Sequence, residues 1–405
     1  MLQILRNADV YAPTALGIQD LIVGGGKILW MGAAAPKIAE LGQGLTVDNS
    51  VLGREIDLQG QRLIPGLIDG HVHFTGGGGE AGFATRVPPL ALNQFLDNGI
   101  TSAIGVLGFD DCTRSTAELL ATTRGFAEHG FGAWCMTGGY HLPLTTLIGS
   151  VREDLVHLDR VIGVGEFALS DHRSSQPTLA EFLRLASEAH FGALATNKAC
   201  LLHLHMGDGA RGLELVRAAL EQSELPAAMF QPTHINRRRA LFEEALDLAA
   251  DGCPIEVTAF PVAEDEDAWS AEAAVELFLE TDLPRERLTI SSDGGGCLPE
   301  FDENGRMTAM EVGQPSSITD CLQNLLNRGL ALETVLPFFT SNVAQTWRLQ
   351  GKGQICVGAD ADLVTLDSSG RPERVMLGGA FTQTQTSGAR DHAAPEPKTQ
   401  PSKNN

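Results

Sequence analysis

The pattern of apolar and polar positions divides the chain into a short-strand region at each end and a long middle region. Residues 1–60 form short apolar runs separated by Gly-rich turns and lack long helical periodicity, which is typical of a small β domain. From residue 61 to residue 346, short apolar runs alternate with helical segments. This alternation predicts a barrel in which each parallel strand is followed by a helix.

Eight apolar runs in the middle region are the expected barrel strands, at residues 63–74, 101–108, 133–138, 160–166, 199–205, 228–235, 254–258 and 287–293. Residues 347–382 return to short strands and should complete the small β domain with residues 1–60. Residues 383–405 are polar, lack apolar periodicity and are expected to be disordered. The predicted fold class is α/β, a (β/α)8 TIM-like barrel with a small β-sandwich domain formed by both chain ends.

Composition and charge narrow the classes of function. The 405 residues are 43% hydrophobic and include 45 glycines, which suits a soluble globular protein with many tight turns. Because 51 acidic residues outnumber 29 Lys and Arg, nucleic acid and anionic membranes are not expected as partners. Seven cysteines without a C-x-x-C pair predict a reducing cytoplasm. No apolar run is long enough for a transmembrane helix, which needs about 18 residues.

A histidine pair ends the first expected barrel strand, in the sequence GLIDGHVHF. Side chains alternate along a strand, so His71 and His73 should both point into the barrel mouth. Such a pair could also be two hydrogen-bonded core histidines. Its position at the carboxyl end of a barrel strand, where barrel enzymes keep their chemistry, favours a pair of metal ligands.

Ligand-type side chains also end four other expected strands: Glu166, His203 or His205, His234 and Asp293. A single buried histidine often only meets a backbone carbonyl, but agreement among these strand ends indicates one shared site. Nitrogen and carboxylate ligands without thiolate suit two divalent ions, with Zn²⁺ as the first choice. His203 and His205 face the same side, so spacing leaves both open; His205 is preferred because it lies nearer the open end.

Several stretches, namely GLIDGHVHFTGGGGEAG, TGGYHLP, ALSDHRS, LHMGD, PTHINR and SSDGGG, resemble the isoaspartyl (β-aspartyl) dipeptidases of the amidohydrolase superfamily over nearly the whole chain. The resemblance implies that His71 and His73 bind the more buried ion, and that His205 and His234 bind the second. It also implies that Asp293 binds the bridging water and shuttles its proton, and that the protein assembles as a homo-octamer.

The resemblance further implies a set of substrate-binding residues: Gly78, Glu80, Phe109, Tyr140, Arg173, Arg237 and Cys297. An isoaspartyl dipeptide carries one ammonium and two carboxylates, so a carboxylate from Glu80 and guanidinium groups would suit it. Tyr140 could donate its hydroxyl to the developing oxyanion, and Glu80 and Tyr140 are also candidate catalytic residues. Other interpretations are a solvated acidic loop for Glu80, a solvated helix start for Arg237 and a packed ring for Tyr140.

One departure from the family pattern lies at the centre of the expected chemistry. Glu166 stands where the resemblance implies a carbamylated lysine that bridges the metals, and glutamate has a shorter reach. Gly165 is one residue more than the family pattern, and an extra glycine can bulge a strand and re-aim its neighbour. Phe109 and Cys297 replace small hydroxyl residues, so they should alter specificity.

The predicted function is hydrolysis of the β-aspartyl peptide bond of dipeptides by a hydroxide held between two metals, with Asp293 as proton shuttle. No G-x-S-x-G motif is present, which disfavours a serine hydrolase. Two alternatives stay open. One is a cyclic amidase similar to dihydroorotase or hydantoinase, and the other is a non-catalytic scaffold with the same fold.

Overall fold

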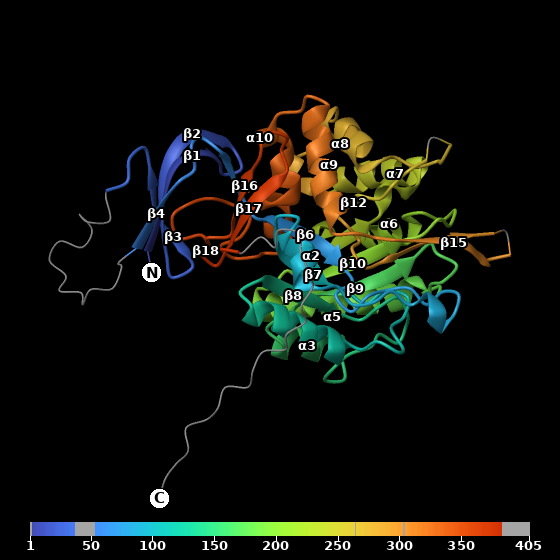
Figure 1. Cartoon of the computed structure of the whole chain (residues 1–405). Coiled ribbons are helices and arrows are strands. Elements are labelled where there is room, and N and C mark those ends of the chain that lie inside the picture. Colours follow the sequence, from blue (N-terminus) through green and yellow to red (C-terminus); the bar gives the residue numbers. More distant parts are fainter. Residues whose placement is uncertain (1, 37–52, 264, 303, 383–405) are drawn as a thin grey trace, which may run out of the picture.

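The computed structural model describes residues 2–36, 53–263, 265–302 and 304–382. The tail predicted at 383–405 lies outside the described residues. Figure 1 shows two parts, a β-sheet built from both chain ends and a larger body of alternating strands and helices. Within the described ranges, no helix combines the length and apolar character needed to cross a membrane.

The small domain is one sheet of strands from both ends of the chain, which lie side by side in Figure 1. Its strands are β1 Leu2–Tyr11, β2 Ala15–Gly24, β3 Lys27–Gly32, β4 Gly53–Asp57, β5 Arg62–Pro65, β16 Leu363–Leu366, β17 Pro372–Leu377 and β18 Ala380–Phe381. β1 pairs with β4 along its first half and with β5 further on. This branch lets the sheet fold around one apolar core that contains Leu5, Leu63 and Leu363.

All eight expected barrel strands are present: β6 Leu67–Val72, β7 Ile100–Gly105, β8 Gly132–Thr137, β9 Val161–Leu169, β10 Leu201–Met206, β11 Phe230–Thr233, β12 Ile255–Thr258 and β13 Leu288–Ser291. The first six form one parallel sheet in chain order, and β12 pairs in parallel with β13. A bridge between Val72 and Gly294 returns the last strand to the first. The (β/α)8 barrel with a small β-sandwich is therefore confirmed.

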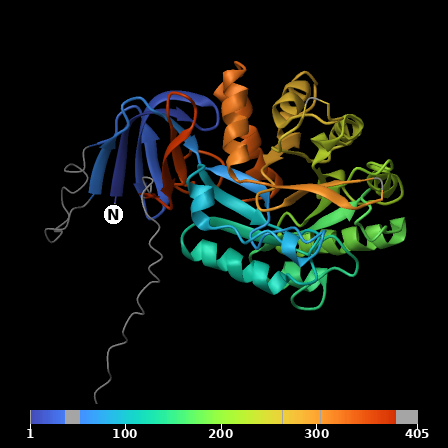
Figure 2. The ribbon, with the colours of Figure 1, turned by 45° about the vertical axis from the view of Figure 1, so that its right-hand side comes forward.

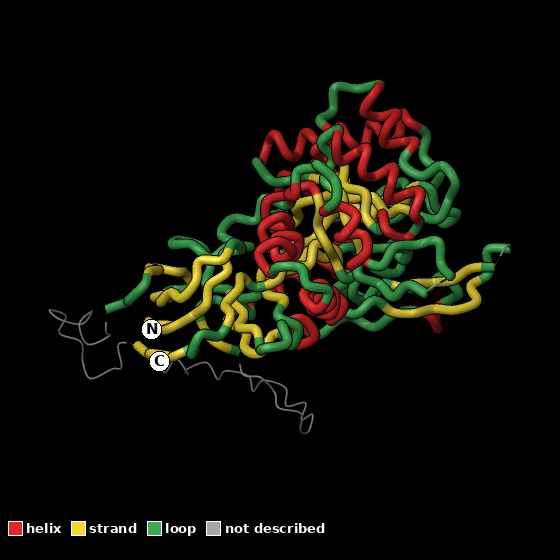
Figure 3. Tube along the Cα trace, turned by 90° about the horizontal axis from the view of Figure 1, so that it is seen from above, coloured by secondary structure: helices red, strands yellow, loops and turns green. Residues whose placement is uncertain are grey.

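Helices cover the outside of the barrel, as seen in Figures 2 and 3. They are α2 Leu92–Leu96, α3 Thr116–Glu128, α4 Val151–His157, α5 Leu179–Thr196, α6 Glu214–Glu221, α7 Arg239–Ala250, α8 Ala271–Leu279, α9 Ser316–Asn327, α10 Leu332–Val335 and α11 Ser341–Thr346. In α5 a capping box between Thr178 and Glu181 starts the helix. Phe182, Leu185 and Ala189 then bury one face against the barrel.

Short 3-10 turns complete the connections: η1 Phe83–Thr85, η2 Ala227–Met229, η3 Ile235–Arg237, η4 Arg285–Arg287 and η5 Leu336–Phe339. η3 directly follows His234, and η1 begins three residues after Glu80. η3 begins after His234, whose backbone is left-handed with φ 61°.

The structure differs from the sequence prediction at two places. The run 63–74 is two strands, because β5 pairs with β1 and β16 of the small sheet and β6 begins the barrel. Residues on both sides of Gly66, from Leu63 to Ile68, are apolar, so the pattern does not mark the change of pairing partner there. A hairpin that the pattern did not predict, β14 Cys297–Phe301 and β15 Met307–Val312, projects from the barrel end in Figures 1 and 3.

Candidate active site

The expected metal ligands converge at the carboxyl ends of the barrel strands. His71 comes from β6, Glu166 from β9 and His205 from β10, while His234 directly follows β11 and Asp293 stands two residues after the end of β13. Each of them is at most 6% exposed. His234 and Asp293 have left-handed backbones, with φ 61° and 50°, a rare conformation that turns each side chain at the strand end.

Four atoms surround a position suited to one ion. His71 Nε2 lies 3.5 Å from both Glu166 Oε2 and Asp293 Oδ1, and His73 Nε2 lies 3.6 and 3.1 Å from the same two oxygens. Ligands about 2.05 Å from a tetrahedral ion are separated by about 3.3 Å. In the described part of the chain, His71 Nε2, Glu166 Oε2 and Asp293 Oδ1 have no hydrogen-bond partner. Orphaned buried atoms with this spacing fit a metal ion.

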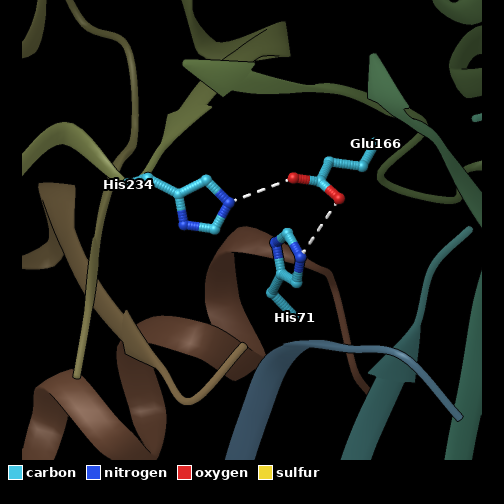
Figure 4. A group of neighbouring side chains, drawn as sticks. All are labelled: His71, Glu166 and His234. Carbon is cyan, nitrogen blue, oxygen red and sulfur yellow. Dashed lines mark hydrogen bonds and ion pairs between the residues drawn. The ribbon is translucent and has the colours of Figure 1, made fainter. Parts of the chain in front are cut away.

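The other oxygen of Glu166 faces a second pair of histidines. Glu166 Oε1 lies 2.5 Å from His205 Nδ1 and 3.0 Å from His234 Nε2. Figure 4 shows the carboxylate between His71 and His234, with one oxygen directed to each ring. A carboxylate that divides its oxygens between two histidine pairs has the arrangement of a ligand that bridges two ions.

A bulge in β9 brings the short glutamate side chain to this position. Between Leu202 and Leu204 of β10, the pairing advances from Val164 to Phe167 on β9, so one extra residue is accommodated. Gly165 lies in the bulge with φ 144°. A Cβ at Gly165 would lie 2.5 Å from the carbonyl oxygen of His203, so only glycine fits there.

The charges of the cluster favour added positive charge between the ligands. Burial would lower the pKa of His71, but the facing carboxylates of Glu166, Asp293 and Glu256 raise it to about 10. Burial opposes ionisation of Glu166, yet the histidines around it, above all His71 and His205, hold its pKa well below the usual range. Burial lowers the pKa of His234 to about 4. A neutral His234 keeps a lone pair available for a metal.

Arg173 links the ligands to the loop that carries Glu80. Its guanidinium donates Nη2 to Asp171 Oδ2 at 2.7 Å and Nη1 to Glu80 Oε1 at 3.2 Å. Asp171 Oδ2 also lies 3.1 Å from His205 Nε2. Sequence reasoning missed Asp171, although it stands two residues before Arg173 in the quoted stretch ALSDHRS. Its carboxylate holds the guanidinium fork in one orientation beside the second histidine pair.

A cavity of about 820 Å³ opens above the cluster. The predicted residues that line it are His73, Gly78, Glu80, Phe109, Tyr140, His205, His234, Arg237, Asp293 and Cys297. His71, Glu166 and Arg173 do not line it because their side chains are almost fully buried. The hairpin contributes Leu298, Pro299 and Phe301 to the wall. These hairpin residues were not predicted, because their strands pair only with each other, outside the barrel repeat.

Burial determines the protonation state of two side chains in the cavity, Tyr140 and Cys297. The Tyr140 hydroxyl lies 2.8 Å from His205 Nδ1, and burial raises its pKa well above the usual value, so it stays a hydrogen-bond donor. Burial and the Glu80 carboxylate raise the pKa of Cys297, which keeps the thiol protonated. Since the thiolate is the reactive form, Cys297 does not have the character of a nucleophile.

The remaining predicted residues occupy the cavity entrance and the barrel interior. Arg237 donates Nη1 to the Met206 carbonyl at 2.9 Å and pairs with Asp208 at 3.1 Å. Phe109 meets Tyr140 edge to face, with ring centroids 6.4 Å apart. His203, the alternative to His205, lies behind His71, with its two ring nitrogens 2.8 Å from His71 Nδ1 and 3.0 Å from Gln231 Oε1.

Comparison with known proteins places this site in a family. Residues 62–382 match the Amidohydrolase family. The β-aspartyl dipeptidase of Fervidobacterium islandicum AW-1, solved in complex with β-Asp-Leu, is 38% identical, with a TM-score of 0.87, and the match covers 94% of this chain and 96% of that chain. The resemblance seen in the sequence motifs is confirmed by this similarity.

More distant relatives are cyclic amidases by name. The allantoinase of Rubrobacter xylanophilus is 25% identical over 87% of this chain and 86% of that protein. The dihydropyrimidinase of Brevibacillus agri NCHU1002 has a TM-score of 0.60 at 15% identity, with 94% of this chain and 95% of that chain covered. At 15% identity, the similarity to the dihydropyrimidinase shows only that the two proteins share a fold.

Proposed function

This chain belongs to the amidohydrolase family, and from that membership we propose that it hydrolyses the β-aspartyl (isoaspartyl) peptide bond of dipeptides. It is a metal-dependent hydrolase. The observation that carries the proposal is the layout of charges around the cavity. The carboxylate of Glu80 and the guanidinium groups of Arg173 and Arg237 lie beside the ligand cluster. They match a ligand with one ammonium and two carboxylates.

The donor atoms support two divalent ions, which we propose to be Zn²⁺. His71, His73 and Asp293 would hold one ion, His205 and His234 the other, and Glu166 both. When bound, the ions would activate a water molecule for attack and polarise the amide carbonyl. The fit rests on orphaned atoms and on spacings of 3.1–3.6 Å around the first position.

The protein's own groups would move the protons and stabilise charge. We assign Asp293 to take a proton from the attacking water and to pass it to the leaving amine, because its carboxylate lies between the cluster and the cavity. Tyr140 would donate its hydroxyl to the oxyanion of the tetrahedral intermediate. Its raised pKa ensures that the donor proton is present.

Recognition of the substrate would use the loops above the cluster. Glu80 would pair with the α-ammonium, since its side chain is only 4% exposed and faces the cavity. Arg173 and Arg237 would bind the carboxylates with their planar forks. Gly78, in the glycine run before Glu80, would let the loop approach the ligand closely, and Phe109 and Cys297 would shape the space beside it.

The allantoinase relative makes a cyclic amidase the second candidate. A cyclic amide such as dihydroorotate or hydantoin has no free ammonium to offer to Glu80 Oε2, the carboxylate oxygen that lacks a hydrogen-bond partner among the described residues. The layout therefore favours the open dipeptide. A non-catalytic scaffold does not account for a complete set of buried ligands around Glu166.

An assay with matched isomers tests the proposed function. β-Asp-Leu and α-Asp-Leu have the same composition and differ in which carboxyl group forms the peptide bond. We expect kcat/KM for β-Asp-Leu to exceed that for α-Asp-Leu by about 100-fold or more. Allantoin and dihydroorotate complete the panel. Turnover of a cyclic substrate without turnover of β-Asp-Leu would contradict the proposal and favour the cyclic amidase.

The family resemblance also leads us to propose a homo-octamer that works in the cytoplasm. The seven cysteines are all free in the structure, as a reducing compartment allows. Light scattering on the purified protein measures the assembly directly. A mass near eight chains is expected, and a monomer would contradict this part of the proposal.

A further inference from the structure

A chain of polar groups runs from His71 into the barrel interior. His203 Nε2 lies 2.8 Å from His71 Nδ1, His203 Nδ1 lies 3.0 Å from Gln231 Oε1, and Gln231 Nε2 donates to Thr289 Oγ1 at 3.2 Å. We propose that His203 is a positioning residue that fixes which nitrogen of His71 faces the metal, and that Gln231 sets the tautomer of His203. This inference rests on the metal binding in the proposed function and adds residues to it.

The hydrogen positions follow from the far end of this chain. Thr289 gives its single hydroxyl hydrogen to the carbonyl of Ile255 at 3.4 Å, so it accepts from the amide nitrogen of Gln231. The amide oxygen of Gln231 therefore faces His203, and an amide oxygen can only accept. His203 must then carry its hydrogen on Nδ1 and accept at Nε2.

The hydrogen position on His203 determines the hydrogen position on the candidate metal ligand His71. Because His203 Nε2 accepts, His71 Nδ1 carries the hydrogen of that contact. In the neutral form of His71, which is the form that binds a metal, Nε2 is then left with its lone pair, and this atom lies 3.5 Å from Glu166 Oε2 and Asp293 Oδ1 without a hydrogen-bond partner in the described ranges. The tautomer of His71 that a metal requires is thus selected by His203.

His203 itself does not have the geometry of a ligand. Both of its ring nitrogens are engaged, and its exposed fraction is 1%. The atoms of His71, His203 and Glu256 are close enough to suggest another metal group. However, the 2.8 Å between His71 Nδ1 and His203 Nε2 is a hydrogen-bond distance, shorter than the roughly 3.3 Å expected for two nitrogen ligands of one tetrahedral ion.

His234 is held in an analogous way. Its Nδ1 lies 2.7 Å from Thr258 Oγ1, and that hydroxyl donates to Glu256 Oε1 at 3.1 Å. Thr258 therefore accepts from His234 Nδ1, which leaves His234 Nε2 directed to Glu166 Oε1 at 3.0 Å. Two ligands from different strands thus receive the same kind of support.

The support of His71 differs in one respect that makes Gln231 necessary. Metal-bound histidines usually donate to a carboxylate, a carbonyl or water. An imidazole acceptor has two neutral tautomers, and the wrong one would donate to His71 Nδ1 and place the hydrogen of His71 on Nε2. A protonated Nε2 cannot bind a metal. Gln231 removes this alternative, so loss of either residue should weaken metal binding without removing a ligand.

The test compares three variants by metal affinity. His203→Gln keeps an acceptor oxygen near the position of Nε2, His203→Leu removes it at similar size, and Gln231→Met removes only the group that sets the tautomer. Zinc dissociation is measured by competition with a chromophoric chelator, and the zinc count at saturation by elemental analysis. We expect all three to hold the wild-type count, with affinity for one ion reduced about 10- to 100-fold in His203→Leu.

The remaining outcomes separate this role from others. His203→Gln should restore affinity to within about 3-fold of wild type, and Gln231→Met should fall between the two His203 variants. Three results would overturn the inference. They are wild-type zinc affinity in His203→Leu, no recovery of affinity in His203→Gln, or a zinc count at saturation below that of wild type in both His203 variants. If the wild type binds zinc but does not cleave β-Asp-Leu, only the proposed function fails. If the wild type binds no zinc, both fail.

Discussion

The candidate site has a floor, partly buried beneath the cavity, and a rim around it, and the two are built in different ways. The floor consists of the candidate ligands His71, His73, Glu166, His205, His234 and Asp293, and the rim of Glu80, Tyr140, Asp171, Arg173 and Arg237. Floor side chains come from strand ends, and His71 and His234 are backed by partners on other strands, His203 on β10 and Thr258 on β12. In the rim, Arg173 pairs with Glu80 and Asp171 from loops.

The floor and the rim also differ in how their polar groups are paired before a ligand binds. In the floor, His71 Nε2, Glu166 Oε2 and Asp293 Oδ1 have no hydrogen-bond partner among the described residues, and the proposed ions would supply one. In the rim, Arg173 and Glu80 neutralise each other at 3.2 Å, and a substrate with an ammonium and a carboxylate would replace that pair with two new ones. Loss of a floor group should therefore cost metal, whereas loss of a rim group should cost substrate recognition.

The largest expected effect comes from Glu166→Gln in the floor. The amide keeps the size of the side chain but has no negative charge to share between two ions. We expect loss of at least one ion per chain and a fall in kcat of about 1,000-fold or more. Elemental analysis and steady-state kinetics measure both. Two retained ions with normal turnover would show that a different residue joins the two histidine pairs.

A smaller effect is expected from Glu80→Gln in the rim. The two ions should stay, while kcat/KM for β-Asp-Leu should fall about 100-fold or more, because the substrate ammonium loses its partner in a partly dry site. Glu300→Gln is the matched control, since Glu300 lines the same cavity on the exposed hairpin. It should change kcat/KM by less than about 3-fold. If both variants lowered kcat/KM by the same factor, Glu80 would not be the residue that binds the substrate ammonium.

The smallest effect concerns pH and His141, next to Tyr140. Its Nδ1 lies 3.0 Å from the carboxylate of Asp111 and its Nε2 lies 2.9 Å from the Arg173 carbonyl. The pKa of His141 is raised, chiefly by the hydrogen bond to Asp111. Burial and the positive charge of Arg173 lower it, but by less. The stabilisation is therefore complete below the unfolded pKa near 6.5 and is lost as pH rises through the folded pKa.

The consequence is measured by thermal unfolding of His141→Asn. Because the ring is partly exposed, with 31% of the side chain accessible, its contribution should stay under about 1 kcal/mol. The variant should melt about 1–3 °C below wild type at pH 5.5, and the difference should shrink at pH 9. A difference that grows with pH would show that a neutral His141 is the stabilising form.

The sequence predicted much of the floor and less of the rim. Alternation in His71-Val72-His73 and the common position of strand ends were enough to predict one converging cluster, and the bulge at Gly165 is present. The pattern could not separate His203 from His205, because both face inward and only their partners distinguish them, His71 on β6 for His203 and Glu166 on β9 for His205. Glu256 was missed, although a carboxylate inside the apolar strand 255–258 was a visible signal.

The rim was less predictable because its contacts join loops far apart in the chain. Arg173 and Glu80 are 93 residues apart, and no periodic pattern connects them. The family resemblance named both, but not Asp171, which orients the guanidinium. The hairpin was missed for a different reason, because its two strands pair with each other and stand outside the barrel repeat.

The central claim is that Glu166 joins two metal positions without help from a carbamylated lysine. The direct test is reconstitution of the metal-free protein with Zn²⁺ in degassed buffer, with and without added bicarbonate, followed by metal count and turnover of β-Asp-Leu. A glutamate carboxylate is permanently present, whereas a carbamate must form from dissolved carbon dioxide. We expect two ions per chain and the same activity in both buffers. Dependence of either quantity on bicarbonate would contradict the account.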